Sequence, residues 1–205
     1  MFGFLSIFAV SLYAITGGPS VGKTSIIKEL ENMGEVTCRE AATDIISEYQ
    51  SNGVAHPWEL SGFESQVYFE KVTREKDALT KAKDQGKKKV FTDRGLLDTL
   101  VYLETNNKLN TDEYLKVNDH LKSLCLTDHY KAVFFVEPYT GSEFIADDTG
   151  VRHEDTTEAI RLGLETKRTY AKAGIPIIIV PPHMTPKQRA EFVLEKLHNL
   201  EKSAQ

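Results

Sequence analysis

Residues 11–24 read Ser-Leu-Tyr-Ala-Ile-Thr-Gly-Gly-Pro-Ser-Val-Gly-Lys-Thr, an apolar stretch that runs directly into a glycine-rich turn. Glycine, four further residues, glycine, lysine and then threonine is the pattern of a phosphate-binding loop that joins a strand to a helix. The four fixed positions would coincide by chance in a chain of this length roughly once in a hundred. An apolar stretch precedes the turn and helix-like residues follow it, so we interpret the segment as a nucleotide phosphate site.

Each fixed residue of this loop has a physical task. Gly17 and Gly22 permit backbone angles that a Cβ atom would forbid, and successive backbone N–H groups then turn inward to bind an anion. The helix that follows points the positive end of its dipole at the same place. Lys23 is expected to reach the outer phosphates, and the Thr24 hydroxyl is expected to ligate Mg²⁺. The predicted nucleotide contacts are Gly17, Gly18, Pro19, Ser20, Val21, Gly22, Lys23, Thr24 and Ser25.

The N-terminal run from Met1 to Ile15 contains no charged side chain. It is shorter than the about 20 apolar residues of a transmembrane helix, and it lacks the basic start of a signal peptide. We expect residues 1–10 to be an apolar extension, either an extra segment or the product of a start codon placed too early. Residues 11–205 are expected to form a single domain. A membrane-inserted N-terminus is the less favoured alternative.

The composition limits the classes of function. Hydrophobic residues make up 40% and charged residues 27% of the 205 residues, which is typical of a globular domain with its own core. The formal net charge is −5, so no overall basic field is present to hold nucleic acid. Cys38 and Cys125 match no metal-binding spacing. One disulfide is an alternative, but two buried thiols and a cytoplasmic location are favoured.

Strand-like and helix-like segments alternate along the chain, which predicts an α/β fold with a parallel sheet covered on both faces by helices. The expected strands are 11–16, 35–38, 89–92, 132–136 and 175–180. The expected helices are 24–32, 41–51, 60–84, 96–104, 111–124, 156–173 and a last one that starts at Pro186, with Ala190, Val193, Leu194 and Leu197 on its inner face.

Ligands of such a sheet bind at the carboxyl ends of its strands, where this sequence has two pairs of a carboxylate and an arginine. Asp93 is expected to be a magnesium-associated carboxylate, although it could also cap the next helix. Arg94 is expected to hold substrate or phosphate, unless it forms a surface ion pair. Glu40 is expected to bind or deprotonate an attacking hydroxyl, unless it is a solvated turn residue. Arg39 is a weaker candidate for substrate binding.

The segment 139–155 is polar and long for a connection, and its second half is dense in charge. Long polar loops in compact domains are often lids. We expect Arg152 to close over the transferring phosphoryl group and to neutralise developing charge. On the helix that follows, Arg161 fits a site role and a solvated helix face equally well, and Arg168 is expected to be structural.

Other side chains are weaker candidates. Trp58 could face a substrate base, although packing in the core is favoured. Gln66, Glu70 and Arg74 share one face of the helix 60–84 and could line an acceptor pocket. The histidines show no pairing that suggests a metal site.

Four segments in this order resemble one known family. They are Ile-Thr-Gly-Gly-Pro-Ser-Val-Gly-Lys-Thr at 15–24, Arg-Glu-Ala-Ala at 39–42, Phe-Thr-Asp-Arg-Gly at 91–95 and Asp-Thr-Gly-Val-Arg-His-Glu-Asp at 148–155. Together they resemble the AAA-type ATPase-like domain shared by the NadR nicotinamide riboside kinases and the translocation-defect GTP-binding proteins. The likeness covers about residues 11–200, and the last segment is its most specific part.

The resemblance implies a nucleoside-kinase-like P-loop NTPase fold, with three layers and five parallel strands in the order 2-3-1-4-5. It also implies ATP or GTP with Mg²⁺, with Glu40 and Asp93 near the acceptor and the metal, and with Arg152 on the lid. The pair Arg39-Glu40 departs from the acidic cluster of the riboside kinases, so the resemblance leaves open whether nicotinamide riboside is the substrate. We expect neither an adenylyltransferase domain nor a lipid-binding domain beside this one.

These patterns predict an enzyme that transfers the γ-phosphoryl group of ATP to a hydroxyl of a small nucleoside-like molecule. The alternative is an ATP- or GTP-binding switch or NTPase without a small-molecule acceptor, including an ATPase of a toxin or phage-defence system. The absence of an Asn-Lys-x-Asp guanine motif favours the enzyme. The expected partners are therefore a nucleotide and a small acceptor, with no nucleic acid and no membrane; a homodimer stays open.

Overall fold

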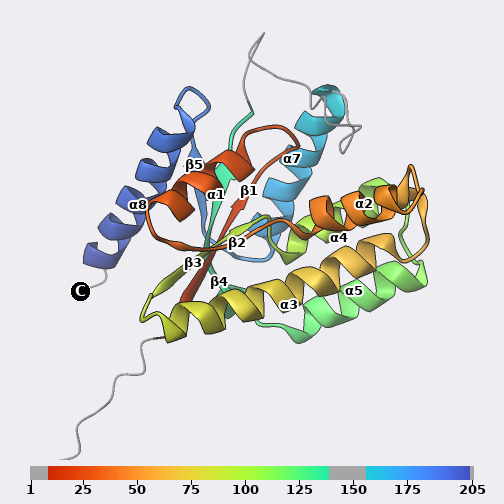
Figure 1. Ribbon diagram of the computed structural model, residues 1–205, viewed down its shortest axis with the longest axis horizontal. Coiled ribbons are helices and arrows are strands. Elements are labelled where there is room, and N and C mark those ends of the chain that lie inside the picture. Colours follow the sequence, from red (N-terminus) through yellow and green to blue (C-terminus); the bar gives the residue numbers. More distant parts are fainter. Residues whose placement is uncertain (1–8, 139–155, 204–205) are drawn as a thin grey trace, which may run out of the picture.

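The computed structural model of the protein describes residues 9–138 and 156–203. The strands of this part are parallel and form a five-stranded sheet in the order β2-β3-β1-β4-β5 (Figure 1). They are β1 (Ser11–Thr16), β2 (Val36–Cys38), β3 (Lys89–Asp93), β4 (Tyr130–Val136) and β5 (Ile177–Val180). This order confirms the predicted fold class of a P-loop NTPase.

The helices connect these strands and cover the sheet. They are α1 (Lys23–Asn32), α2 (Ala41–Ser51), α3 (Phe63–Asp84), α4 (Leu96–Thr105), α5 (Asp112–Ser123), α6 (Leu126–His129), α7 (Thr156–Lys172) and α8 (Pro186–Ser203), with a short 3₁₀ turn η1 (Pro57–Glu59) before α3. The sequence predicts each of the longer helices to within a few residues, which reflects their strong periodicity.

The prediction differs from the structure most clearly at two boundaries and at one short helix, each for a local reason. Helix α3 begins at Phe63 rather than at Leu60, because Gly62 at its N-cap adopts a left-handed φ of 86°. Strand β4 begins at Tyr130 rather than at Ala132. The exposed Lys131 interrupts the apolar run from which the strand was predicted, whereas Tyr130 before it is buried and belongs to the strand. The short helix α6 was not predicted, because four residues carry too little periodicity to be recognised.

The sheet separates two hydrophobic clusters, as a strand buried on both faces requires. Successive residues of β1 alternate between them: Leu12 and Ala14 belong to one cluster, and Tyr13 and Ile15 to the other. The first cluster includes side chains of α3, α4, α5 and α7. The second includes side chains of α1 and α8, among them the predicted inner-face residues Ala190, Val193 and Leu197, with Leu194 partly buried against it. Figure 1 shows α8 beside α1, apart from the group formed by α2, α3, α4 and α5.

The structure also bears on the predictions about membrane insertion and about the two cysteines. Within residues 9–138 and 156–203, no helix has both the length and the apolar character that crossing a membrane requires. Residues 1–8 of the apolar extension lie outside the described part. Both cysteines are free, but only Cys38 is buried and Cys125 is exposed. The prediction of two buried thiols is therefore wrong for Cys125, which lies at the N-cap of the short surface helix α6.

Candidate functional site

The phosphate loop has the backbone geometry that its glycines predict. Gly17 has a φ of 145°, and a Cβ atom there would lie 2.6 Å from the backbone oxygen of Val136. Gly22 has a φ of 89° and occupies the N-cap of α1. Ser20 also adopts a positive φ, 58°, which is uncommon for a residue with a Cβ atom. The turn therefore approaches the end of β4 closely and leads into α1 with its N–H groups available to an anion.

Lys23 lies folded across this loop. Its residue is only 2% exposed, and its Nζ donates hydrogen bonds to the backbone oxygens of Gly17 at 3.2 Å and Gly18 at 2.6 Å. The loop thus contains a buried positive charge at the place where the motif predicts the outer phosphates of a nucleotide.

Thr24 and Asp93 meet at the entrance of the loop. The hydroxyl of Thr24 donates to Oδ2 of Asp93 at 2.8 Å. Oδ1 of Asp93 is buried and has no hydrogen-bond partner among the residues that the structure describes. Burial raises the pKa of the Asp93 carboxyl and the charge of Glu40 raises it further, so a bound cation would relieve an unfavourable negative charge.

These two oxygen ligands fit a magnesium ion that also binds nucleotide phosphates. Mg²⁺ prefers oxygen ligands, keeps several waters and needs only one or two carboxylates from the protein. No group of three or more acidic, histidine or cysteine side chains with the geometry of a metal site occurs in the described ranges. The Thr24 hydroxyl and the Asp93 carboxylate therefore suit a cation that is shared with a ligand.

Arg94 occupies the centre of the site in an unusual backbone conformation. Its φ is 61°, and its backbone N–H donates to the oxygen of Ile15 at 2.9 Å. Its Nε donates to Oε1 of Glu40 at 2.5 Å, and its Nη1 lies 3.3 Å from Oδ1 of Asp98. Burial opposes the charged form, but the surrounding oxygens, chiefly those of Tyr102 and Glu40, raise the pKa of Arg94 well above its ordinary value. The left-handed backbone turns a permanent cation toward Glu40.

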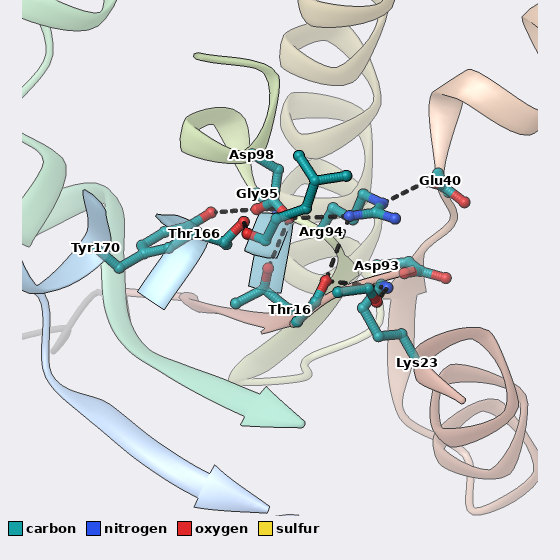
Figure 2. A network of polar contacts seen from close by, with 12 residues as sticks. Thr16, Lys23, Glu40, Asp93, Arg94, Gly95, Asp98, Thr166 and Tyr170 are labelled. Atoms are coloured by element: carbon teal, nitrogen blue, oxygen red, sulfur yellow. Dashed lines mark hydrogen bonds and ion pairs between the residues drawn. The ribbon is translucent and has the colours of Figure 1, made fainter. Parts of the chain in front are cut away.

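Asp98 accepts hydrogen bonds from several members of this network (Figure 2), and the sequence alone did not identify it. Its Oδ1 accepts from the hydroxyl of Thr16 at 2.6 Å, and its Oδ2 accepts from the N–H of Gly95 at 3.0 Å and the hydroxyl of Tyr170 at 2.8 Å. A Cβ atom at Gly95 would lie 2.3 Å from the Tyr170 hydroxyl, so the position requires glycine. One buried carboxylate thus joins β1, the start of α4 and helix α7.

Two basic side chains of α3 support the same strand ends. Nζ of the buried Lys71 donates to the backbone oxygen of Asp93 at 2.7 Å and lies 3.6 Å from Sγ of Cys38. Nη1 of Arg74 donates to the backbone oxygen of Glu40 at 3.1 Å. Lys71 was not singled out by the sequence, although its spacing from Arg74 places both on one face of the helix.

A cavity of about 480 Å³ opens beside this network. Its charged end contains Glu40, Asp93 and Arg94, while Trp58, Phe63 and Tyr102 contribute aromatic surface. The other lining residues are Ala41, Ala42, Thr43, Ile46, Glu64, Val67, Lys71, Gly95, Asp98, Thr99, Asn106, Glu158 and Leu162. A mainly apolar cavity with a few convergent polar groups is the usual form of a small-molecule site.

The structure brings most of the predicted site residues together but separates others. Arg39 does not line the cavity: its side chain is 70% exposed and pairs with Glu31 at 3.0 Å. Trp58 packs, partly buried, against a cluster that includes Ile45 and Phe63, as the favoured prediction has it, and it also lines the cavity. Arg152 lies outside the described residues.

None of the three weaker candidates on α3 and neither of the two arginines of α7 lines this cavity, although Glu158, the partner of Arg161, does. Gln66, Glu70 and Arg74 line a separate outer groove. Arg161 pairs with Glu158, and Arg168 with Glu165, each three residues along the helix. The outer face of α7 is therefore solvated and charged, which agrees with the structural role predicted for Arg168.

The sequence profile of the AAA domain family matches residues 12–189. The chain belongs to this family. The matched region contains the phosphate loop, both arginine–carboxylate pairs and the strands that position them. The AAA domain therefore includes the site described above. A search of the curated proteins found no match.

Solved structures that resemble this AAA domain include two of NadR and one of a nucleoside kinase. NadR in complex with NR aligns over 92% of this chain and 52% of its own, with a TM-score of 0.69 and 16% identity. NadR with NAD and AMP-PNP aligns over 93% and 49%, with a TM-score of 0.61 and 16% identity. This chain thus spans about half the length of those NadR chains.

Deoxyadenosine kinase from M. mycoides with bound dATP aligns over 92% of this chain and 99% of its own, with a TM-score of 0.57 and 15% identity. At such low identities the comparisons establish a shared nucleoside-kinase-like P-loop fold. That fold is typical of nucleotide-binding phosphotransferases and NTPases.

Proposed function

We propose that this protein is a magnesium-dependent phosphotransferase that moves the γ-phosphoryl group of ATP to a hydroxyl of a small nucleoside-like molecule. The observation that carries the proposal is the cavity of about 480 Å³, whose charged end includes Asp93 and Arg94, both of which contact residues of the phosphate loop. A nucleotide switch or a simple NTPase needs the phosphate loop but does not need a second small-molecule site next to it.

On the donor side, the loop N–H groups and Lys23 would bind the phosphates of ATP. Thr24 and Asp93 would hold Mg²⁺, directly or through water, and the ion would neutralise phosphate charge when it is bound. The hydrogen bond of 2.8 Å between the two side chains supports this role, because it already brings the two candidate ligand oxygens together.

On the acceptor side, Glu40 would orient the acceptor hydroxyl and take its proton. The acceptor oxygen would then attack the γ-phosphorus, the bond from that phosphorus to the β–γ bridging oxygen would break, and ADP would leave. Arg94 and the hydroxyl of Thr43 both donate to the Glu40 carboxylate, at 2.5 Å and 3.1 Å, which restricts its orientation. Catalysis of this kind depends on positioning and electrostatics.

The cavity walls support a flat acceptor with polar edges. Trp58, Phe63 and Tyr102 offer aromatic surface on which a planar ring can stack, and Glu64 and Asn106 offer polar groups to its edge. The NR bound to NadR and the dATP bound to deoxyadenosine kinase are consistent with a nucleoside-like acceptor for this shared fold.

The test is a phosphorylation screen with γ-labelled ATP, or GTP in its place, against a panel of nucleosides and nicotinamide riboside. The first of our predictions is that labelled product depends on one acceptor, and that Glu40→Ala lowers kcat for it roughly 10²- to 10⁴-fold. Arg39→Ala is the matched control, since the neighbouring side chain is exposed and lies away from the cavity; its kcat should stay within about twofold of the wild-type value. Nucleotide hydrolysis that no acceptor accelerates would contradict the proposal and favour the switch or NTPase.

A further inference from the structure

Arg189, in the first turn of α8, is a buried cation that lies against the outside of the phosphate loop. The residue is 1% exposed. Its Nη1 donates to the backbone oxygen of Val21 at 2.8 Å, and its Nη2 donates to the backbone oxygen of Pro182. The guanidinium therefore connects the loop to the turn between β5 and α8.

The contact with Val21 constrains the next N–H group of the loop. The described peptide bonds are all trans, and in a trans peptide the C=O and the following N–H point in opposite directions. Because the oxygen of Val21 points toward Arg189, the N–H of Gly22 must point away from it. That direction leads to the interior of the loop, where the motif predicts the phosphates.

Gly22 also allows the guanidinium to come close. A Cβ atom at this position would lie 3.3 Å from Nη1 of Arg189, and the φ of 89° is one that residues with side chains rarely adopt. The missing side chain of Gly22 thus leaves room for the guanidinium of Arg189. The positive charge of Arg189 lies directly behind a loop that has to attract several negative charges.

The position of Arg189 separates it from the acceptor site. It does not line the acceptor cavity, and α8 packs against α1, in the cluster on the face of the sheet that includes Val21 and Ile26 (Figure 1). A substitution of Arg189 should therefore change the affinity for the donor nucleotide and leave the affinity for the acceptor unchanged.

We propose that Arg189 is a positioning residue for the donor phosphates: it fixes the Val21–Gly22 peptide so that the Gly22 N–H is aimed into the loop before a nucleotide binds, and it adds positive charge behind the loop. The inference rests on the nucleotide site of the proposed function and needs no acceptor. Preorganised donors of this kind cost no rearrangement when the ligand arrives.

The experiment measures ADP and ATP affinity by calorimetry in the presence of Mg²⁺, for the full chain and three variants. Arg189→Met removes the charge and both hydrogen bonds and should weaken ADP binding roughly 10- to 100-fold. Arg189→Lys keeps the charge and can donate to one carbonyl, so its loss should be about threefold to tenfold. Leu197→Ala is the matched control: Leu197 is also buried on α8, so the change should lower the melting temperature and leave ADP affinity within about twofold.

A wild-type affinity in Arg189→Met would overturn the inference, and so would an equal loss in Leu197→Ala. If Arg189→Met does not fold, Arg189→Lys decides: an affinity within twofold of the wild-type value refutes the role. Failure of the wild-type protein to bind ADP or ATP would remove the nucleotide site and with it the proposed function. Wild-type binding with no change in the Arg189 variants would remove this inference alone.

Discussion

The phosphate loop and the proposed acceptor cavity are neighbours, yet they are built by different means. The loop is one continuous segment whose proposed ligand groups are mostly backbone N–H groups, shaped by the positive φ values of Gly17 and Gly22. The cavity is assembled from side chains of α2, α3, α4, α7 and the connecting turns, and its charged end depends on hydrogen bonds between them. The phosphate loop should therefore depend little on the side chains that line the cavity, while the cavity should lose order when one member of its side-chain network is changed.

The network around Arg94 is the place where the two regions are joined. Arg94 contacts Glu40 at the cavity, and its Nη1 lies 3.5 Å from the backbone oxygen of Gly17 in the loop. Asp98 binds both Arg94 and Thr16, the residue directly before the loop. Substitutions on either side of this junction can show whether the two regions act independently.

Of the changes at the loop and at the junction, the largest effect is expected on the loop side. Lys23→Ala removes the cation that lies inside the loop, and kcat should fall roughly 10³-fold, about 4 kcal/mol in activation free energy, because the charge on the transferring group is no longer balanced. Steady-state kinetics with the acceptor found in the screen provides the measurement. Acceptor binding, followed by calorimetry without nucleotide, should be unchanged.

Lys28→Ala is the control for this change, since Lys28 lies on the same helix but is exposed. Its kcat should match the wild-type value. A loss of acceptor binding in Lys23→Ala would break the separation between the two regions.

A smaller effect is expected at the junction. Each oxygen of Asp98 accepts from two donors, so an amide nitrogen in either place would face donors. Asp98→Asn should lower the free energy of unfolding by about 2–3 kcal/mol, measured by urea denaturation. The KM for the acceptor should rise because Arg94 no longer holds Glu40 in place, whereas ADP affinity should change little.

The exposed Asp119 of α5 offers a control of the same chemistry. Asp119→Asn should leave both unfolding and acceptor KM unchanged. If Asp98→Asn weakens ADP binding as much as it raises the acceptor KM, then the loop depends on the side-chain network of the cavity and the comparison must be revised.

The same contrast explains how much of the protein its sequence could predict. The loop and β1 are contiguous, so a motif and an apolar run sufficed to place them, and the carboxyl end of a parallel strand was enough to single out Asp93 and Arg94. Asp98, Lys71 and Arg189 act through contacts with residues far away in the chain, and no local pattern reports such contacts.

Arg39 shows the opposite error. It follows β2 and was therefore expected near the ligand, but Glu31 of α1 accepts from its guanidinium on the protein surface. A rule about strand ends indicates the edge of the sheet at which a residue lies; it does not indicate the direction in which the side chain turns.

The smallest expected effect concerns the hydroxyl of Tyr170, which joins α7 to Asp98 at 2.8 Å. Tyr170→Phe keeps the buried ring and removes one donor, so the free energy of unfolding should fall by about 1 kcal/mol. Burial, and then the charge of Asp98, raise the pKa of Tyr170 well above its ordinary value. The stabilisation from this hydroxyl is therefore fully present below the unfolded-state pKa of about 10 and is lost only as the pH rises through the higher folded-state pKa.

Urea denaturation of Tyr170→Phe and wild-type protein should thus show a constant difference between about pH 6 and pH 9. Tyr114→Phe supplies a partly exposed comparison on α5, whose hydroxyl contact to Glu104 at 3.5 Å should contribute much less. A difference for Tyr170→Phe that grows as the pH falls toward 6 would mean that a group other than the hydroxyl titrates in the network.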